Sequence, residues 1–323
     1  MPRHPYEPVD CSQLRTFSVA RRSHKVSQDQ LAGLPLRGAS AAELLASLPE
    51  VLGAAELRAV VRAIVEAVRG ERPVVFAMGA HVVKVGCAPL IIDLIERGVI
   101  AAVVGNGALA IHDYEMAALG ATSEEVAETI RDGSFGMVRE TMEFFAAASD
   151  LACRDALGLG EAVGRLLAER DVPHRELSIL AAAQRAGIPA CVHVAMGTDT
   201  VHMAPQADGA RIGAATLRDF KLVCSVVGDL GAAEPGGPGG VWLNLGSAVI
   251  LPEVFLKAVS VARNLGADLD RLTTANFDML RHYRPRVNVV LRPTAAGRGH
   301  EVIGHHEILL PLLRQAVIEG LAG

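Results

Sequence analysis

The chain has 323 residues, of which 50% are hydrophobic and 21% are charged. This hydrophobic fraction is enough for a sizeable core and argues against global disorder. The net charge of −5 argues against a basic surface for nucleic acid. The five cysteines have no CxxC spacing, which predicts reduced thiols rather than a zinc finger or a disulfide scaffold.

The sequence contains no window of roughly 20 apolar residues that would suit a membrane span. The first thirty residues also lack the apolar region of a secretory signal. We therefore expect a cytoplasmic protein with no membrane partner.

The N-terminal part of the chain differs in pattern from the rest. Residues 1 to about 38 are polar and rich in turn formers, which predicts an arm. Residues 40–69 carry an apolar stripe at helical spacing. Pro49 is expected to split this stretch into two helices, and Gly70 to end the second. We predict an arm with helices over 1–70 and one domain over 71–323.

The domain over 71–323 alternates apolar strand patterns with helical patterns. Such alternation predicts an α/β fold with a doubly wound, mostly parallel sheet of Rossmann type. The expected strands are 74–78, 100–104, 188–195, 241–245, 272–277 and 287–291. The expected helices are 88–96, 113–119, 123–131, 138–147, 175–186, 210–227, 253–264 and 307–321.

Small residues followed by ionisable ones come after nearly every predicted strand. In this fold class, ligands bind beyond the carboxyl ends of the strands. The recurring pattern therefore predicts a site at that edge of the sheet. Its candidates are Gly79, Ala80, His81, Lys84, Gly105, Asn106, Gly107, His112, Asp113, Glu115, Thr198, Asp199, His202, Gly246, Ser247, Glu253, Asp278, His282, Arg292, His300 and His305.

The segment GNGALA at 105–110 fits the pattern G-x-G-x-x-A directly after an apolar strand. Its glycines would let the backbone approach a pyrophosphate at a helix start. It follows the second strand, however, and no acidic residue ends a strand about 20 residues later. A glycine-rich turn that only packs strand against helix is the alternative and, on this motif alone, the favoured one.

Other catalytic chemistries remain alternatives. His193, Asp199 and His202, or His305, His306 and Glu307, could supply metal ligands, although no HExxH spacing is present. Ser247 lacks the GxSxG context of a nucleophile. Lys84 could form an imine with a carbonyl substrate, because it lies in a loop expected to face the ligand.

The segments FAMGAHVVKVGCAPLIIDLIERGVI, VVGNGALAIHDYEMAALG, IPACVHVAMGTDTVHM, VWLNLGSAVILPEVFLKAVSVARNLGAD and TTANFD resemble the deoxyhypusine synthase-like family. They come in that family's order and span roughly residues 73–294. The resemblance implies a six-stranded Rossmann-type sheet that binds NAD, in a homotetramer with sites at subunit interfaces.

Carried over by position, the resemblance implies a set of NAD-contacting loops. Asp199 and Asp278 look like the family's aspartates for ribose hydroxyls, which would favour NAD over NADP. The implied NAD contacts are Gly79, Ala80, His81, Gly105, Asn106, Gly107, Asp113, Thr198, Asp199, Gly246, Ser247, Asn276 and Asp278.

The chain departs from that family where the family carries its imine-forming lysine. The corresponding text here is NVVLRPT, with Arg292 and no lysine, and an arginine cannot form the imine. The turn GNGALAIHDYE is also similar to the loop of the NAD-dependent ornithine cyclodeaminase-type domain. That chemistry oxidises an amine and returns the hydride without a lysine bridge.

The sequence thus favours an NAD-dependent enzyme that oxidises a small amine, either a polyamine or an amino acid. His112, Asp113 and Glu115 would orient the substrate or bind its ammonium group. His282 or His305 would act as general base, because imidazole titrates near neutral pH. A metal-dependent hydrolase or lyase and a non-catalytic NAD-binding protein are the alternatives. No metal ligand is assigned, and we expect a homo-oligomer, since the apolar helices need covering.

Overall fold

The computed structural model describes residues 5–295 and 297–323 of the chain. Its centre is a sheet of six parallel strands in the order β3-β2-β1-β4-β5-β6. The strands are β1 (Val74–Met78), β2 (Ala102–Asn106), β3 (Ala190–His193), β4 (Val241–Leu245), β5 (Thr273–Asp278) and β6 (Gly299–Ile303). The predicted doubly wound α/β class is therefore confirmed. The strand order reverses between β1 and β4.

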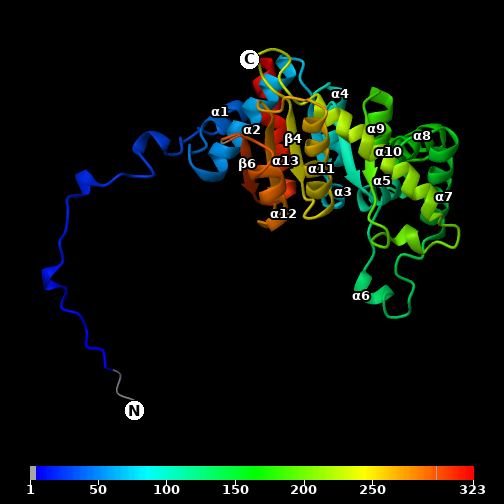
Figure 1. Cartoon of the computed structure of the whole chain (residues 1–323), viewed down its shortest axis with the longest axis horizontal. Helices are drawn as coiled ribbons and strands as arrows, with labels where there is room; N and C mark the ends of the chain where they lie inside the picture. The colour runs from blue at the N-terminus through cyan, green and yellow to red at the C-terminus, as the bar shows by residue number, and fades with distance from the viewer. Residues whose placement is uncertain (1–4, 296) are drawn as a thin grey trace.

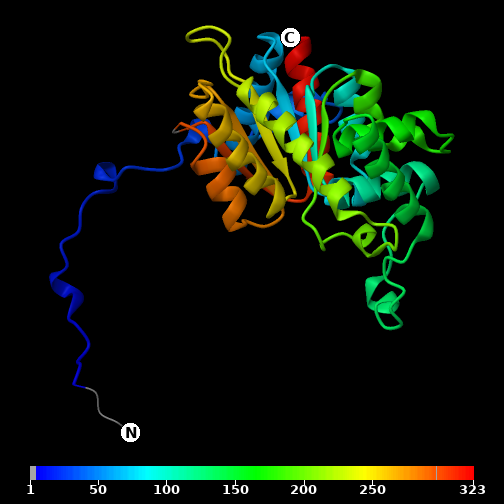
Figure 2. The ribbon, with the colours of Figure 1, turned by 45° about the vertical axis from the view of Figure 1, so that its right-hand side comes forward.

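Helices cover both faces of the sheet, as Figures 1 and 2 show. One face packs against α2 (Leu52–Arg69), α4 (Ala88–Glu96), α9 (Ile179–Ala186) and α13 (His306–Ala322). The other face packs against α10 (Gly209–Gly228) and α11 (Ile250–Asn264). Burial on both faces explains why β1 is a continuous apolar run and why β4 is apolar except for Asn244.

The remaining helices lie at the ends and edges of the sheet. They are α1 (Ala41–Ala46), α3 (His81–Lys84), α5 (Gly107–Leu119), α6 (Val126–Thr129), α7 (Arg139–Arg154), α8 (Leu159–Glu169) and α12 (Tyr283–Pro285). The short 3-10 helices are η1 (Cys11–Gln13), η2 (Val19–Arg21), η3 (Gln28–Gln30), η4 (Arg175–Leu177) and η5 (Thr200–Met203). A π-helical segment, η6, spans Arg286–Leu291.

The edge strand β3 is covered by side chains of α10. Asp219 Oδ2 accepts the backbone N–H of Val192 at 2.9 Å, and the Thr216 hydroxyl contacts Val192 and Val194. An uncovered edge would leave these backbone groups free to pair with another chain. The helix α10 therefore closes this side of the sheet.

The prediction of a sixth strand at 287–291 is wrong. This apolar run forms η6, in which Val289 and Val290 are buried, and the Thr274 hydroxyl donates to the Val289 carbonyl at 2.7 Å. The actual sixth strand, GHEVI, lies at the sheet edge and is only partly buried. Because this strand contains polar residues, its sequence does not show the apolar run that predicts a buried strand.

Two helix predictions also need correction. The helix expected over 123–131 is limited to α6, in a segment that projects from the body (Figure 1). The helix α8 was not predicted at all. Its glycines let α8 approach its neighbours, because a Cβ on Gly160 would lie 2.3 Å from the Ala190 carbonyl oxygen.

The N-terminal part divides as expected around Pro49, with α1 ending at Ala46, α2 beginning at Leu52 and Gly70 capping α2. The arm from residue 5 to residue 39 runs away from the body (Figures 1 and 2). The helix α2, by contrast, packs into the core through Leu57, Val60 and Ile64. The predicted boundary at residue 70, between the N-terminal arm with its helices and the domain over 71–323, stays a prediction. Within the described residues, no helix is both long enough and apolar enough to cross a membrane.

Candidate functional site

A cavity of about 370 Å³ lies beside the carboxyl ends of β1, β2 and β3. Its volume falls within the roughly 300–1,000 Å³ typical of small-molecule sites. The predicted residues Lys84, His112, Glu115, Thr198 and Asp199 all line it. They come from α3, α5 and the loop after β3, so the fold brings together residues that are far apart in sequence.

The charged side chains of this cavity are mostly acidic. Glu115, Glu124 and Asp199 contribute carboxylates, whereas Lys84 contributes one ammonium group. Glu124 is fixed by the backbone N–H of Gly136, which donates to its carboxylate at 2.8 Å. Several carboxylates around a small cavity favour a cationic ligand, because an uncompensated buried charge is costly.

Glu115 lies deep in the cavity wall and is held by hydroxyl groups. Thr122 donates to its Oε2 at 2.5 Å, and Thr141 donates to its Oε1 at 3.4 Å. Burial alone would raise the pKa of the Glu115 carboxyl, but hydrogen bonds with His112 and Thr122 outweigh it, so the pKa is lowered. Glu115 is therefore an ionised carboxylate at neutral pH.

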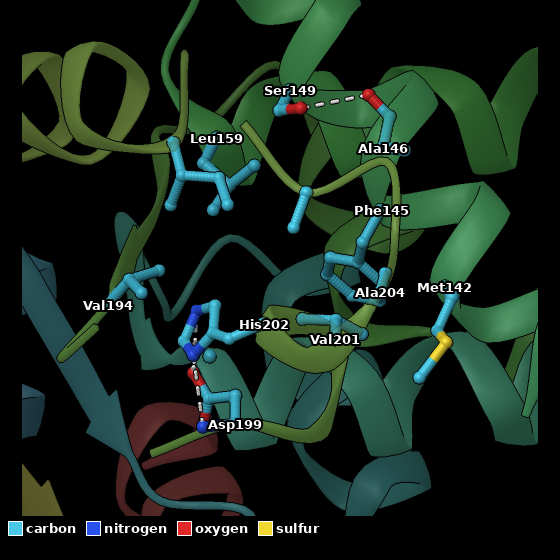
Figure 3. A pocket seen from close by; sticks show the side chains of 13 residues that line it. Met142, Phe145, Ala146, Ser149, Leu159, Val194, Asp199, Val201, His202 and Ala204 are labelled. Carbon is cyan, nitrogen blue, oxygen red and sulfur yellow. Dashed lines mark hydrogen bonds and ion pairs between the residues drawn. The ribbon is translucent and has the colours of Figure 1, made fainter. Parts of the chain in front are cut away.

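Asp199 also lines a second, much smaller cavity. The second cavity has a volume of about 20 Å³, room for a single water molecule, and is lined mainly by apolar side chains such as Met142, Phe145 and Leu159. Figure 3 shows Asp199 and His202 at its polar end. Burial raises the pKa of the Asp199 carboxyl.

His202 fixes the loop that carries Asp199. Its Nδ1 accepts the backbone N–H groups of Gly197 at 3.1 Å and Asp199 at 3.2 Å. The ring proton must therefore lie on Nε2, which is 3.9 Å from Asp199 Oδ2 (Figure 3). The sequence predicts His202 as a strand-end candidate and, alternatively, as a metal ligand. The spacing Asp199-x-x-His202, a capping box, is the signal that could have revealed this role.

The start of α5 is filled by the protein's own side chains. A Cβ on Gly107 would lie 2.0 Å from Asp199 Oδ2, and Asn106 Oδ1 caps the helix by accepting the N–H of Leu109 at 2.9 Å. The Asp199 carboxylate is thus closely packed against Gly107. The assignment of Gly105, Asn106 and Gly107 to the cofactor stays a prediction, and this packing favours the alternative of a glycine-rich turn.

Asp113, which is predicted as a cofactor contact, lies away from the acidic cavity. Its side chain is fully buried and caps the start of α9, accepting from the Ser178 hydroxyl at 2.5 Å and the Ile179 N–H at 2.7 Å. The physical reason is its position on α5, which turns this residue toward α9 and away from the cavity. Asp113 is therefore a structural residue.

The other predicted cofactor residues gather where the strand order reverses. A Cβ on Gly79 would lie 2.4 Å from the Gly246 carbonyl oxygen, so the turns after β1 and β4 touch each other, with Ala80 and Ser247 beside them. Asn276 Oδ1 accepts from Asn244 at 2.8 Å, and Asp278 ends β5. These residues are brought together, and α3, which follows Ala80, contributes Lys84 to the acidic cavity.

Several buried polar atoms around these turns have no hydrogen-bond partner among the described residues. They are His81 Nε2, Asn244 Oδ1, Asn276 Nδ2 and His306 Nδ1. His306 was predicted only as a possible metal ligand, and it is buried with its Nε2 donating to the Phe277 carbonyl at 3.0 Å. The sequence pattern does not place His306 near the ends of the strands, because it does not predict β6, the strand that precedes this residue. Unpartnered polar groups at a sheet edge fit a polar ligand or ordered water.

The two histidines predicted as general bases lie elsewhere. The side chain of His305 is 62% exposed and lies 3.7 Å from Glu307. The side chain of His282 is 38% exposed, with its Nε2 3.9 Å from Asp278 Oδ1. Neither lines the acidic cavity. In the parts of the chain that the structure describes, no three His, Cys, Asp or Glu side chains are grouped to hold a metal ion.

No family model matches the chain, and no curated protein does. The structure is similar to that of ArgZ, an arginine dihydrolase from the ornithine-ammonia cycle in Cyanobacteria, with a TM-score of 0.51 and 14% identity over 84% of this chain and 34% of that one. Unliganded AgrE gives a TM-score of 0.51 and 17% identity over 83% of this chain and 34% of that one. The chain thus spans about a third of each. A putative deoxyhypusine synthase from Entamoeba histolytica gives 0.49 and 10% identity over 88% and 94%, a score too low to support a conclusion. At these identities the similarity to ArgZ and AgrE establishes a shared fold and nothing further.

Proposed function

We propose that the chain is an NAD-dependent enzyme that oxidises a small cationic amine. The observation that carries this proposal is the acidic cavity at the carboxyl edge of a Rossmann-type sheet. In such sheets, dinucleotides bind at the point where the strand order reverses, which here lies between β1 and β4. The amine would lie beside it, among Glu115, Glu124 and Asp199.

The residues present fit NAD at the turns after β1, β4 and β5. Glycine at positions 79 and 246 lets the turns after β1 and β4 pack against each other and against His306. The Asp278 carboxylate suits ribose hydroxyls. The unpartnered atoms Asn276 Nδ2 and His306 Nδ1 could bond to such a ligand. The start of α5 does not fit, because Asp199 occupies it.

When bound, NAD would supply the hydride chemistry. The chain's own residues would bind and orient the amine. Lys84 has no hydrogen-bond or ion-pair partner in the described residues and lines the acidic cavity, so it could pair with an anionic group of the substrate. Arg292, which stands where the deoxyhypusine synthase-like family carries its imine-forming lysine, donates to Asn288 at 3.0 Å and lies outside the cavity. The proposal therefore includes no group transfer through an imine.

NAD binding is the first test. Thermal-shift titrations with NAD, NADH and NADP, together with native mass spectrometry, should show NAD bound. At 100 times its dissociation constant, NAD should stabilise the fold by about 2.7 kcal/mol. Asp278→Ala should abolish the shift. Asp270→Ala is the matched control. It removes an exposed carboxylate just before β5, at the amino ends of the strands and thus at the opposite end of the sheet from Asp278. No shift with any nucleotide would refute the proposal.

The amine is tested separately through Asp199. Asp199→Asn keeps the shape of the side chain but removes its charge, so the affinity for the cationic substrate should fall at least about tenfold, the effect of one hydrogen bond to a charged group. Substrates are screened among diamines, polyamines and basic amino acids, with products followed by mass spectrometry. NAD binding should be unchanged in this variant, and unchanged amine affinity would contradict the assignment.

A further inference from the structure

His112, Thr122 and Glu115 form a chain of polar contacts in the wall of the acidic cavity. His112 Nδ1 lies 2.7 Å from Thr122 Oγ1, and Thr122 Oγ1 lies 2.5 Å from Glu115 Oε2. The direct distance from His112 Nδ1 to Glu115 Oε2 is 3.5 Å. The hydroxyl therefore bridges the imidazole and the carboxylate.

The local sequence explains this geometry. His112 and Glu115 are three residues apart on α5, so they share one face of the helix. Gly120 ends α5 in the left-handed conformation, with φ of 68°, and the chain turns back over that face. Thr122 is thereby brought against both side chains.

The proton positions follow from the donors and acceptors. The lowered pKa of Glu115 means that its carboxylate is ionised and only accepts. The single hydroxyl proton of Thr122 must then point to Glu115, so Thr122 accepts from His112. The proton of a neutral His112 ring must consequently lie on Nδ1, which leaves Nε2 with a free electron pair.

The His112 side chain lines the acidic cavity. His112 is the one histidine among the described lining residues, its side chain is 18% exposed, and its Nε2 has no described hydrogen-bond partner. His202 differs, because both of its ring nitrogens are committed to the loop around Asp199. The ionisable groups around the cavity are Lys84 on α3, Glu115 on α5, and Glu124 and Asp199 on the flanking loops.

We propose that His112 is the general base of this site and that Thr122 is the positioning residue that links it to Glu115. This inference rests on the proposed function. His112 Nε2 takes a proton from the substrate ammonium, leaving a neutral amine. When bound, NAD would supply the hydride acceptor for oxidation of the carbon beside this nitrogen. Glu115 stabilises the imidazolium through Thr122.

The tautomer of His112 provides a test that does not depend on activity. Long-range nitrogen–proton NMR of the full-length protein should show a protonated Nδ1 and an unprotonated Nε2. Thr122→Val should shift the ring toward the Nε2-protonated form, whereas Thr122→Ser should restore the original tautomer. Thr129→Val is the matched control, because its hydroxyl donates to the Glu125 carbonyl in the same segment and lies outside the cavity.

Turnover provides the second measurement. His112→Gln should lower kcat about 100-fold or more. Thr122→Val should lower kcat about tenfold, the equivalent of one hydrogen bond, with a smaller change in KM and an altered pH profile. Thr122→Ser should recover most of the loss. A protonated Nε2 in the unmodified protein, or equal loss in Thr122→Ser and Thr122→Val, would overturn the proposal.

The two proposals fail in different ways. If no nucleotide binds but His112 shows the expected tautomer, NAD-dependent oxidation is refuted, and so is the role of His112 in that reaction. The hydrogen-bonded arrangement of His112, Thr122 and Glu115 would still be supported. Nucleotide binding with an Nε2-protonated His112 refutes the relay and leaves the proposed function intact.

Discussion

Three buried ionisable side chains lie at structural positions close to the sheet. Burial raises the pKa of Asp219 to about 7 and that of Asp113 to about 6, although both accept backbone hydrogen bonds. Burial lowers the pKa of His193 to about 4. The two acids and the histidine therefore affect the pH dependence of stability in opposite directions.

The sign for Asp219 follows from proton binding. Because its folded-state pKa is raised, the folded protein binds more protons than the unfolded chain between about pH 4 and pH 7. This contribution is fully present below about pH 4 and is lost as the pH rises toward 7. For His193 the unfolded chain binds more protons between about pH 4 and pH 6.5, so its contribution is lost as the pH falls.

Asp219→Asn isolates the first effect. The amide oxygen can still accept from Gly160 and Val192, but the group no longer titrates. Between about pH 5 and pH 7, the free energy of unfolding should fall by roughly 2 kcal/mol more in the unmodified protein than in the variant. Denaturant titrations at several pH values measure it. Asp208→Asn, at the exposed start of the same helix, is the control, and identical pH slopes in all three proteins would contradict the assignment.

At the scale of elements, α8 shows how glycines let a helix approach a strand. Gly160 faces the Ala190 carbonyl of β3, and Gly164 faces the Leu180 carbonyl of α9, where a Cβ would lie at 2.3 Å and 2.7 Å. Such close contacts leave no space for a larger residue without moving the helix. The low helix propensity of glycine is here offset by packing.

Gly160→Ala should therefore destabilise the protein by about 1–3 kcal/mol. Gly213→Ala is the matched control, because Gly213 also lies in a helix but a Cβ there would meet nothing within 4 Å. This control should be neutral or stabilising by up to about 1 kcal/mol. Chemical denaturation compares the two, and equal effects would show that α8 is free to shift.

The same packing explains which elements the sequence predicts. The predicted bounds of β1 and β4 are confirmed, because both faces of these strands are buried and their sequences are apolar except for Asn244. The sequence pattern does not predict β6, because this edge strand is only partly buried and contains polar residues. It does not predict α8, because the glycines that let this helix approach β3 and α9 have low helix propensity. The residues Lys84, His112, Glu115, Thr198 and Asp199, which the strand ends predict, line the acidic cavity. The strand ends do not predict Thr122, since its role depends on a reversal of the chain after Gly120.

At the scale of the whole molecule, the arm and two exposed apolar areas stand apart from the core. None of the described residues before Gln30 is buried, even partly. Leu119, Ile130 and Met137 are exposed around α6, and Leu280 and Tyr283 are exposed after β5. Exposed apolar areas of this kind suit contacts between subunits, so the homo-oligomer remains our expectation.

Removal of residues 1–27 should leave the thermal midpoint of the body unchanged, because the buried core begins only at Leu57. Any change in the free energy of unfolding should stay within about 0.5 kcal/mol. Calorimetry of the full-length and shortened chains checks this, with the mass of both assemblies measured in parallel. A large fall in the midpoint would mean that the arm contributes to the folded body or to its assembly.

The relay of His112, Thr122 and Glu115 is encoded within eleven consecutive residues, whereas residues 198–200, which also line the cavity, come from a distant part of the sequence. Its geometry therefore depends on one helix and one turn. Selection could reshape the distant loop, and with it the molecule that is accepted, while the proton-transfer unit is inherited unchanged. A single short segment would then support a range of substrates across diverging sequences.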